Sequence, residues 1–272
     1  YRYENFDDYV RTKFRIFKNQ EADDYAIINL DDPVIEAVLK KIRLSSNVIE
    51  LRPLSGEVIG NSDGLYLSGD EIIFSLDGKL ESYPAQGFGL ITAAGGGRGL
   101  NTNSVENIMA VIASARLAGV ERESIIKSIN SFKGLSHRME FVREAGGVTY
   151  INDSKATNPA SVVRALEGLT GPVVLIAGGV DKGLDFNVLA AQVKEKARFV
   201  VLFGEAGSRI NKALSGFADT VLVGGFDEAV EIAQRRAEAG DTVLLSPACS
   251  SFDEFKSFIE RGEKYKELLG AF

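Results

Sequence analysis

The stretch that decides the fold is Tyr150-Ile-Asn-Asp-Ser-Lys-Ala-Thr-Asn-Pro159. Its first residues complete a predicted strand, Val148–Asn152, and apolar residues at helical spacing follow Pro159, a position where proline favours the first turn of a helix. A strand therefore leads through a polar turn into a helix. In parallel α/β sheets, ligands bind where the carboxyl end of a strand meets the amino terminus of a helix.

The turn itself concentrates charged and hydrogen-bonding side chains. It contains the carboxylate of Asp153, the ammonium group of Lys155 and the hydroxyls of Ser154 and Thr157. Taken alone, the turn leaves two interpretations open. Its side chains bind a ligand, or they only cap the free N–H groups at the start of the helix.

The residues after Ser136 alternate between short apolar runs and amphipathic segments. Such alternation predicts a doubly wound, mostly parallel, Rossmann-like sheet with right-handed crossovers. The predicted strands are Val148–Asn152, Val173–Gly178, 199–203, 220–223 and 242–245, and the predicted helices are 160–169, 186–196, 207–214, 227–239 and 252–269.

Three of these strands end in polar turns, at residues 152–155, 178–183 and 246–251. Because the carboxyl ends of parallel strands share one edge of a sheet, the three turns are expected to meet. Lys155, Lys182 and the hydroxyls that follow Cys249 would then converge on one anionic ligand. Those hydroxyls belong to Ser250 and Ser251.

The first half of the chain has a different pattern, which predicts a partial α/β domain containing an antiparallel β meander. The glycine-rich segment 86–98 matches neither G-x-G-x-x-G nor G-x-x-x-x-G-K-[ST], so it is interpreted as a turn. We predict a domain boundary near residue 135, giving domains 1–135 and 136–272. The expected elements are a helix at 5–19, a strand at 25–30, a helix at Pro33–Leu39, the meander at 47–84, helices at 104–117 and 122–130, and a hinge at 131–136.

The composition narrows the class of protein. A length of 272 residues, with 45% hydrophobic and 25% charged residues, is typical of one or two globular domains. A formal net charge of −7 disfavours a nucleic-acid surface. The single cysteine, Cys249, excludes an internal disulfide and fits a reducing cytosol. The only histidine, His137, is interpreted as a structural hydrogen-bonding residue.

Several stretches together resemble the Mur ligase family. They are Asn29-Leu-Asp-Asp-Pro33, Ser136-His-Arg-Met-Glu140, Asn152-Asp-Ser-Lys-Ala-Thr-Asn158 and Leu245-Ser-Pro-Ala-Cys-Ser-Ser251, and the resemblance extends over about residues 3–269. The last two stretches are similar to those of the members that add D-glutamate. The D-N-P-R motif of the members that add a diamino acid is not found.

The resemblance implies an ATP-dependent amide-bond ligase of peptidoglycan synthesis. In this family ATP phosphorylates the carboxylate of UDP-N-acetylmuramoyl-L-alanine, and the amine of D-glutamate attacks the acyl phosphate, with release of ADP and phosphate. Such chemistry needs cations near the phosphates, so ATP and Mg²⁺ are the implied cofactors. A cytoplasmic enzyme that is monomeric at full length, with no nucleic-acid or membrane partner, is also implied.

The resemblance gives individual residues expected roles. Lys13, if carboxylated, would become an anion that holds Mg²⁺, whereas the sequence by itself favours a solvated helix lysine. The expected catalytic residues are Lys13, Lys155 and Lys182, the expected ATP contacts are Asn107, Arg138 and Asp153, and the expected D-glutamate contacts are Thr157, Asp181, Lys182, Ser251 and Phe258.

The sequence also departs from the family pattern. The H-N-x-x-N motif is replaced by Asn103-Ser-Val-Glu-Asn107, so only Asn107 is carried over, and Val180 rather than Asp181 stands at the strictly aligned acidic position. Neither the amino-terminal UDP-binding domain nor the phosphate loop is found. We therefore expect a carboxyl-terminal fragment that does not ligate alone. Two alternatives stay open: a non-catalytic α/β module that binds a nucleotide or an amino acid, and a sibling such as folylpolyglutamate synthase.

Overall fold

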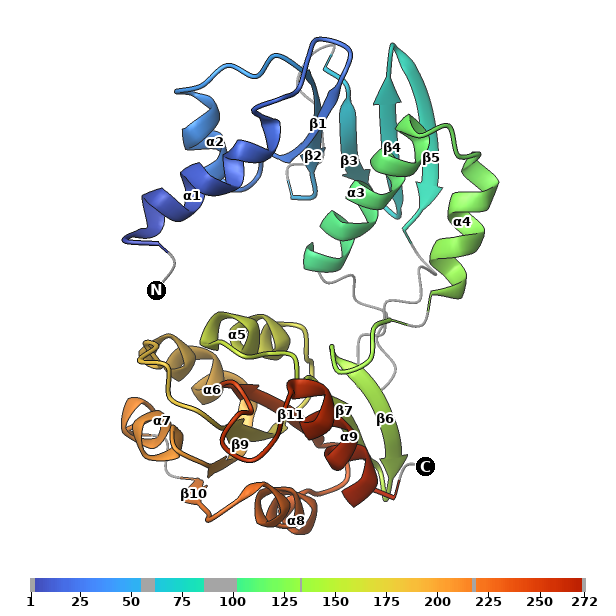
Figure 1. The fold of residues 1–272 in the computed structure, drawn as a ribbon. Coiled ribbons are helices and arrows are strands. Elements are labelled where there is room, and N and C mark those ends of the chain that lie inside the picture. The colour runs from blue at the N-terminus through green and yellow to red at the C-terminus, as the bar shows by residue number, and fades with distance from the viewer. Residues whose placement is uncertain (1–2, 55–61, 86–101, 133, 217–218, 271–272) are drawn as a thin grey trace. The chain divides into compact units, whose positions relative to one another are not determined.

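A computed structural model describes residues 3–54, 62–85, 102–132, 134–216 and 219–270 (Figure 1). The described residues form two compact units, one up to Phe132 and one from Gly134 onward. Each unit has its own β-sheet and its own hydrophobic core. The two units are therefore described separately.

Two short helices of the first unit, one before and one after its first strand, start at side-chain caps. Helix α1 (Phe6–Phe14) starts at Asn5, whose side chain accepts a hydrogen bond from the Asp8 N–H, and a 3₁₀ turn, Arg15–Phe17, follows it. Helix α2 (Pro33–Leu39) starts at Asp32, with proline in its first turn. None of the residues of α1 is buried, so this helix adds nothing to the described core.

The sheet of the first unit has the strand order β1-β2-β3-β4-β5. Strands β1 (Tyr25–Asn29), β2 (Asn47–Arg52) and β3 (Gly64–Ser68) are parallel, and β3, β4 (Glu71–Leu76) and β5 (Lys79–Pro84) are antiparallel. The antiparallel meander predicted over 47–84 is thus wrong for β2, which is parallel to both of its neighbours. Only β3–β5 have the tight turns that antiparallel neighbours need, and the predicted run at 58–59 lies outside the described residues.

Two helices complete the first unit. Helix α3 (Thr102–Leu117) packs against β1, β2 and β3, and it buries Val105, Met109 and Ile112. Helix α4 (Arg122–Ser131) packs on α3. The predicted helix at 104–117 is therefore confirmed, and its buried face covers the sheet.

The second unit contains a six-stranded sheet, and its strand order is β10-β9-β8-β11-β7-β6. All neighbouring strands are parallel except β6, which is antiparallel to β7, so the predicted mostly parallel sheet is confirmed. The strands are β6 (Glu140–Ala145), β7 (Val148–Asn152), β8 (Val173–Gly178), β9 (Ala197–Phe203), β10 (Thr220–Leu222) and β11 (Thr242–Ala248).

Helices cover both faces of this sheet, which makes it doubly wound (Figure 1). Helices α5 (Pro159–Glu167), α6 (Ala190–Lys196) and α7 (Gly207–Ala213) pack on one face, and α8 (Phe226–Arg236) and α9 (Phe258–Leu268) pack on the other. The predicted helix 252–269 is too long at its start, because Ser257 caps α9. Among the described residues, no helix has both the length and the apolar character that a bilayer crossing requires.

Candidate functional site

Three polar turns of the second unit meet at one edge of its sheet. Strands β8, β11 and β7 are neighbours and run parallel, so their carboxyl ends lie together. Backbone hydrogen bonds extend this contact beyond the strands. The Val180 N–H donates to the Ser250 carbonyl at 2.9 Å, and the Asp153 N–H donates to the Leu245 carbonyl at 2.8 Å. The predicted meeting of the turns is confirmed.

The cap of α5 is Asn158, whose side chain accepts a hydrogen bond from the Ser161 N–H at 2.9 Å. The role that the capping interpretation gave to Asp153, Ser154 or Thr157 therefore belongs to a different residue. Asp153 and Ser154 are buried, Thr157 is half-buried and Lys155 is exposed. The turn that precedes the cap thus presents its lysine to solvent.

Asp153 is a buried carboxyl group supported by two hydrogen bonds. The Ser246 hydroxyl donates to one carboxyl oxygen at 2.8 Å, and the Met139 N–H donates to the other at 3.2 Å. Burial raises the pKa of Asp153 to about 7, although both hydrogen bonds and the nearby charge of Arg138 act to lower it. The side chain of Arg138 is exposed. Two of the predicted ATP contacts, Arg138 and Asp153, are therefore neighbours.

Lys155 and Phe258 are brought together from distant parts of the chain. The Lys155 Nζ lies 6.0 Å from the centre of the Phe258 ring, within the range of a cation–π contact. The Lys155 N–H donates to the His137 carbonyl at 3.0 Å, and the His137 ring meets the Phe258 ring edge-on. Phe258 is the first residue of α9. The amino terminus of α9 is therefore part of the same cluster as the turn after β7.

The turn after β8 carries Asp181 and Lys182, and the two side chains differ in their surroundings. Asp181 forms an ion pair with Arg209 of α7, and it accepts a hydrogen bond from the Gly183 N–H at 2.8 Å. The Arg209 hydrogen bond lowers the pKa of Asp181. Lys182 is exposed. The negative charge of Asp181 is thus already compensated within the protein.

The turn after β11 buries both of its predicted hydroxyl side chains. Ser251 is 2% exposed, and its carbonyl accepts a hydrogen bond from the Phe255 N–H at 2.8 Å. Ser250 is 3% exposed, and its hydroxyl has no hydrogen-bond partner in the described part of the chain. Hydrogen bonds fix the backbone of this turn, whereas the Ser250 hydroxyl can still donate or accept a hydrogen bond.

The remaining predicted residues, Lys13 and Asn107, belong to the first unit. Lys13 is exposed on α1, and its Nζ lies 5.3 Å from the centre of the Tyr9 ring. Asn107 is an exposed residue of α3. Within the described ranges, no group of three or more His, Cys, Asp or Glu side chains is placed to hold a metal ion.

Residues of α9 that the sequence analysis did not single out also support the site. Gly262 packs on the buried His137 ring, and a Cβ atom built on it would lie 2.2 Å from His137 Nδ1. Arg261 is fully buried and donates to the Ser154 carbonyl at 2.9 Å. A glycine in the middle of an amphipathic helix often indicates such close packing, so the position of Gly262 in the sequence could have indicated this contact.

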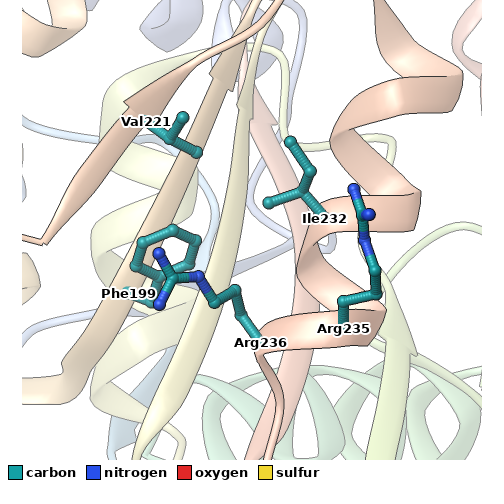
Figure 2. Close-up of a pocket in the computed structure, with 5 residues that line it drawn as sticks. All are labelled: Phe199, Val221, Ile232, Arg235 and Arg236. Atoms are coloured by element: carbon teal, nitrogen blue, oxygen red, sulfur yellow. The ribbon is translucent and has the colours of Figure 1, made fainter.

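A shallow groove lies elsewhere in the second unit, between α8 and strands β9 and β10 (Figure 2). Its volume is about 240 Å³, and Arg236 stacks over the Phe199 ring at 4.8 Å. Phe199 lies in the first half of β9, whereas the predicted turns follow the carboxyl ends of their strands. None of the predicted site residues lines this groove, which is formed by Phe199, Val221, Ile232, Arg235 and Arg236.

Solved structures with a similar fold include several proteins that are named as ligases. MurF from Acinetobacter baumannii superposes with a TM-score of 0.64, at 16% identity, over 97% of this chain and 56% of that chain. FolC from E. coli, solved with DHPP and ADP, superposes with a TM-score of 0.58, at 18% identity, over 92% of this chain and 54% of that chain. At these identities the likeness shows the fold alone.

Sequence comparison assigns the family. Residues 2–115 match the Mur ligase middle domain, and residues 137–249 match the Mur ligase glutamate ligase domain. The chain therefore belongs to the Mur ligase family and contains these two domains.

The chain is also similar to individual curated relatives. It is 42% identical to UDP-N-acetylmuramoylalanine--D-glutamate ligase of Bdellovibrio bacteriovorus, over 100% of this chain and 57% of the relative. It is 40% identical to the protein of the same name from Citrifermentans bemidjiense, over 99% of this chain and 56% of the relative. The chain thus spans little more than half the length of these relatives.

Proposed function

We propose that the complete polypeptide carrying these residues is an ATP-dependent ligase that joins D-glutamate to UDP-N-acetylmuramoyl-L-alanine in the cytoplasm. The observation that carries the proposal is the meeting of three turns, which bear Lys155, Lys182 and Ser251, at one edge of the sheet. Relatives that are 40–42% identical over almost all of the chain, and that carry the name of this activity, support it.

The proposed acceptor site is built for an acidic amino acid. Two exposed lysines, Lys155 and Lys182, stand on the turns after β7 and β8, which lie on either side of the turn after β11. A substrate with two carboxylates and one amine matches two cations on a rigid edge. Phe258 holds the Lys155 side chain through the cation–π contact. Asp181, already paired with Arg209, would act by shaping its turn rather than by contacting the amine. Thr157 and Ser251 complete the proposed D-glutamate contacts.

In the proposed reaction, a carboxylate oxygen of the UDP-sugar substrate attacks the γ-phosphorus of ATP, and ADP leaves. The D-glutamate amine then attacks the acyl carbon, an amide bond forms, the amine loses a proton, and phosphate leaves with the original carboxylate oxygen. Cations such as Lys155 stabilise the charge that accumulates on the transferring phosphoryl group. We assign Asn107, Arg138 and Asp153 to ATP.

Mg²⁺ bound to ATP takes most of its ligands from phosphate and water, and one or two protein carboxylates are sufficient. Lys13 would supply one such anionic ligand after carboxylation, and its exposure on α1 leaves the amine accessible to CO₂. The described residues offer no cluster of three metal ligands, so the fit is to a metal held mainly by the nucleotide. When bound, Mg²⁺ would neutralise phosphate charge.

The proposal is tested by calorimetry with D-glutamate on the chain and on Lys182→Ala. We expect saturable binding of D-glutamate, weaker binding of L-glutamate, and a loss of about tenfold or more in affinity for the variant, because one charge-assisted bond is removed. Lys194→Ala, an exposed lysine of α6, is the matched control and should bind as the parent does. Absence of D-glutamate binding, or equal effects of both variants, would contradict the proposal.

The alternative of a non-catalytic binding module predicts a different result in the same experiment. Such a module would bind a nucleotide without D-glutamate. A folylpolyglutamate synthase-like protein would instead prefer L-glutamate over D-glutamate. The fold of the chain, which is similar to that of FolC, is compatible with this second alternative. Competition between D-glutamate and L-glutamate for binding distinguishes it from the proposed ligase.

A further inference from the structure

Arg261 of α9 is a fully buried cation. Its side chain is 0% exposed, and no carboxylate of the described residues forms an ion pair with it. Burial lowers the pKa of Arg261 to about 10, and the charge of Asp253 partly opposes that effect. Arginine is almost never fully buried unless it is paired, because leaving water is costly for an ion. The free-energy cost of burying Arg261 must therefore be offset by other contacts.

The guanidinium group connects two of the three turns of the proposed site. Its Nε donates to the Ser154 hydroxyl at 3.0 Å, and its Nη2 donates to the carbonyls of Ser154 and Cys249 at 2.9 and 3.0 Å. The Ser154 hydroxyl in turn donates to the Phe258 carbonyl at 2.8 Å. One side chain thus links the turn after β7, the turn after β11 and the start of α9.

The same guanidinium group lies against the third turn. A Cβ atom built on Gly179 would be 3.2 Å from Arg261 Nη1 and 2.3 Å from the Ser250 carbonyl, so only glycine leaves room at this point. Gly179 has φ +126°, a conformation that also favours glycine. Within the described part of the chain, two buried polar atoms at this point have no hydrogen-bond partner. They are Arg261 Nη1 and the Ser250 hydroxyl oxygen.

We infer that Arg261 is a positioning residue that holds the turns after β7, β8 and β11 at the spacing that binds the acidic amino acid. The inference rests on the proposed function and adds to it the residue that arranges Lys155, Lys182 and Ser251. Those three side chains stand on three different turns, so the spacing of the turns sets the spacing of the side chains. Arg261 donates to the backbone of two of these turns and lies against Gly179 of the third.

An apolar side chain at this position could not connect the turns, because it would leave the carbonyls of Ser154 and Cys249 without these donors. Moving a guanidinium group out of water costs free energy, and the hydrogen bonds of Arg261 to the Ser154 and Cys249 carbonyls offset part of that cost. The planar guanidinium offers five donors in a fixed geometry, which lysine cannot reproduce. Two carbonyls and one hydroxyl use that geometry, and the remaining edge faces the glycine turn.

The test compares Arg261→Lys and Arg261→Ala with Arg164→Ala, an exposed arginine of α5 that serves as the control. D-glutamate affinity is measured by calorimetry on folded protein, with the folded fraction taken from thermal unfolding. We expect both Arg261 variants to lose about tenfold or more in D-glutamate affinity, because neither replacement reproduces the fork of donors that holds the turns at their spacing. Millimolar guanidinium, far below denaturing concentrations, should restore part of the affinity of Arg261→Ala and leave the control unchanged.

The outcomes separate the inference from the proposed function. If the parent chain binds D-glutamate and the folded Arg261 variants bind equally well, the inference is overturned and the proposed function stands. If the parent chain binds no D-glutamate, the proposed function itself fails. If neither variant folds, the Nε–H signal of the buried guanidinium in the parent chain decides by NMR: a saturable shift with D-glutamate supports the inference, and an unchanged signal overturns it.

Discussion

Asp153 has a pKa raised to about 7 by burial, and this shift predicts how the pH changes stability. The native state holds the Asp153 proton up to about pH 7, whereas the unfolded chain releases it near 3.8. Between these values the native state binds more protons, so the stability of the protein falls as the pH rises. The free energy of unfolding of Asp153→Asn should not show this contribution.

The measurement is urea unfolding of the parent chain and Asp153→Asn between pH 4 and pH 7.5. We expect the variant to gain a few kcal/mol relative to the parent as the pH rises through this window, on the order set by a shift of about three pKa units. Asp185→Asn, at an exposed residue, is the control. A difference that stays constant with pH would show that Asp153 ionises normally.

At the scale of single residues, the polar turn after β7 could be located from the sequence, but the partners of its side chains could not. The turn after β7 was singled out for its charged and hydrogen-bonding side chains, and Lys155 is exposed there. The partners of Asp181 and Asp153 were not foreseen, because Arg209 and Ser246 lie 28 and 93 residues away along the chain. The burial of Ser251 was missed for the same reason, since long-range packing leaves no local signal.

At the scale of elements, Gly262 makes α9 fit against β7 and His137. Replacing a glycine in a helix by alanine usually stabilises it by up to about 1 kcal/mol. Here the new Cβ would lie 2.2 Å from the buried His137 ring and 3.0 Å from the Asn152 amide. We therefore expect Gly262→Ala to destabilise the chain by about 1–3 kcal/mol, because overpacking forces these groups to move.

Urea unfolding of Gly262→Ala checks this sign. Glu267→Ala, an exposed change on the same helix, should alter the free energy of unfolding by no more than about 0.5 kcal/mol. A stabilised Gly262→Ala variant would mean that α9 does not pack on His137 as described. His137 itself, whose pKa is lowered by burial, matches its interpretation as a structural residue.

Elements with strong periodicity were predicted correctly, and elements defined by their neighbours were not. Strand β8 is a continuous apolar run and strands β7 and β11 are mostly apolar, so the parallel sheet could be predicted from the sequence. Strand β6 was missed, because half of its sequence Glu-Phe-Val-Arg-Glu-Ala is charged and its place depends on pairing with β7. The predicted antiparallel direction of β2 was wrong, because β2 pairs in parallel with β1 and β3 and its own sequence does not indicate those partners.

At the scale of the whole molecule, the second unit has the features of an independent domain. It contains a complete six-stranded sheet with a hydrophobic core on each face. We expect residues 134–272, expressed alone, to unfold cooperatively and to bind D-glutamate within about twofold of the affinity of the 272-residue chain, because every proposed acceptor residue lies in this unit. Thermal unfolding and calorimetry test this expectation, and a non-cooperative transition would contradict it.

The most direct test of the central claim is a ligation assay on the complete polypeptide carrying these residues. The assay contains ATP, Mg²⁺, D-glutamate and UDP-N-acetylmuramoyl-L-alanine labelled with ¹⁸O in its carboxylate, and mass spectrometry follows the products. The proposed acyl phosphate requires that the new amide form with D-glutamate and that the released phosphate carry one ¹⁸O atom. Absence of the D-glutamyl product, or phosphate without the label, would contradict the account.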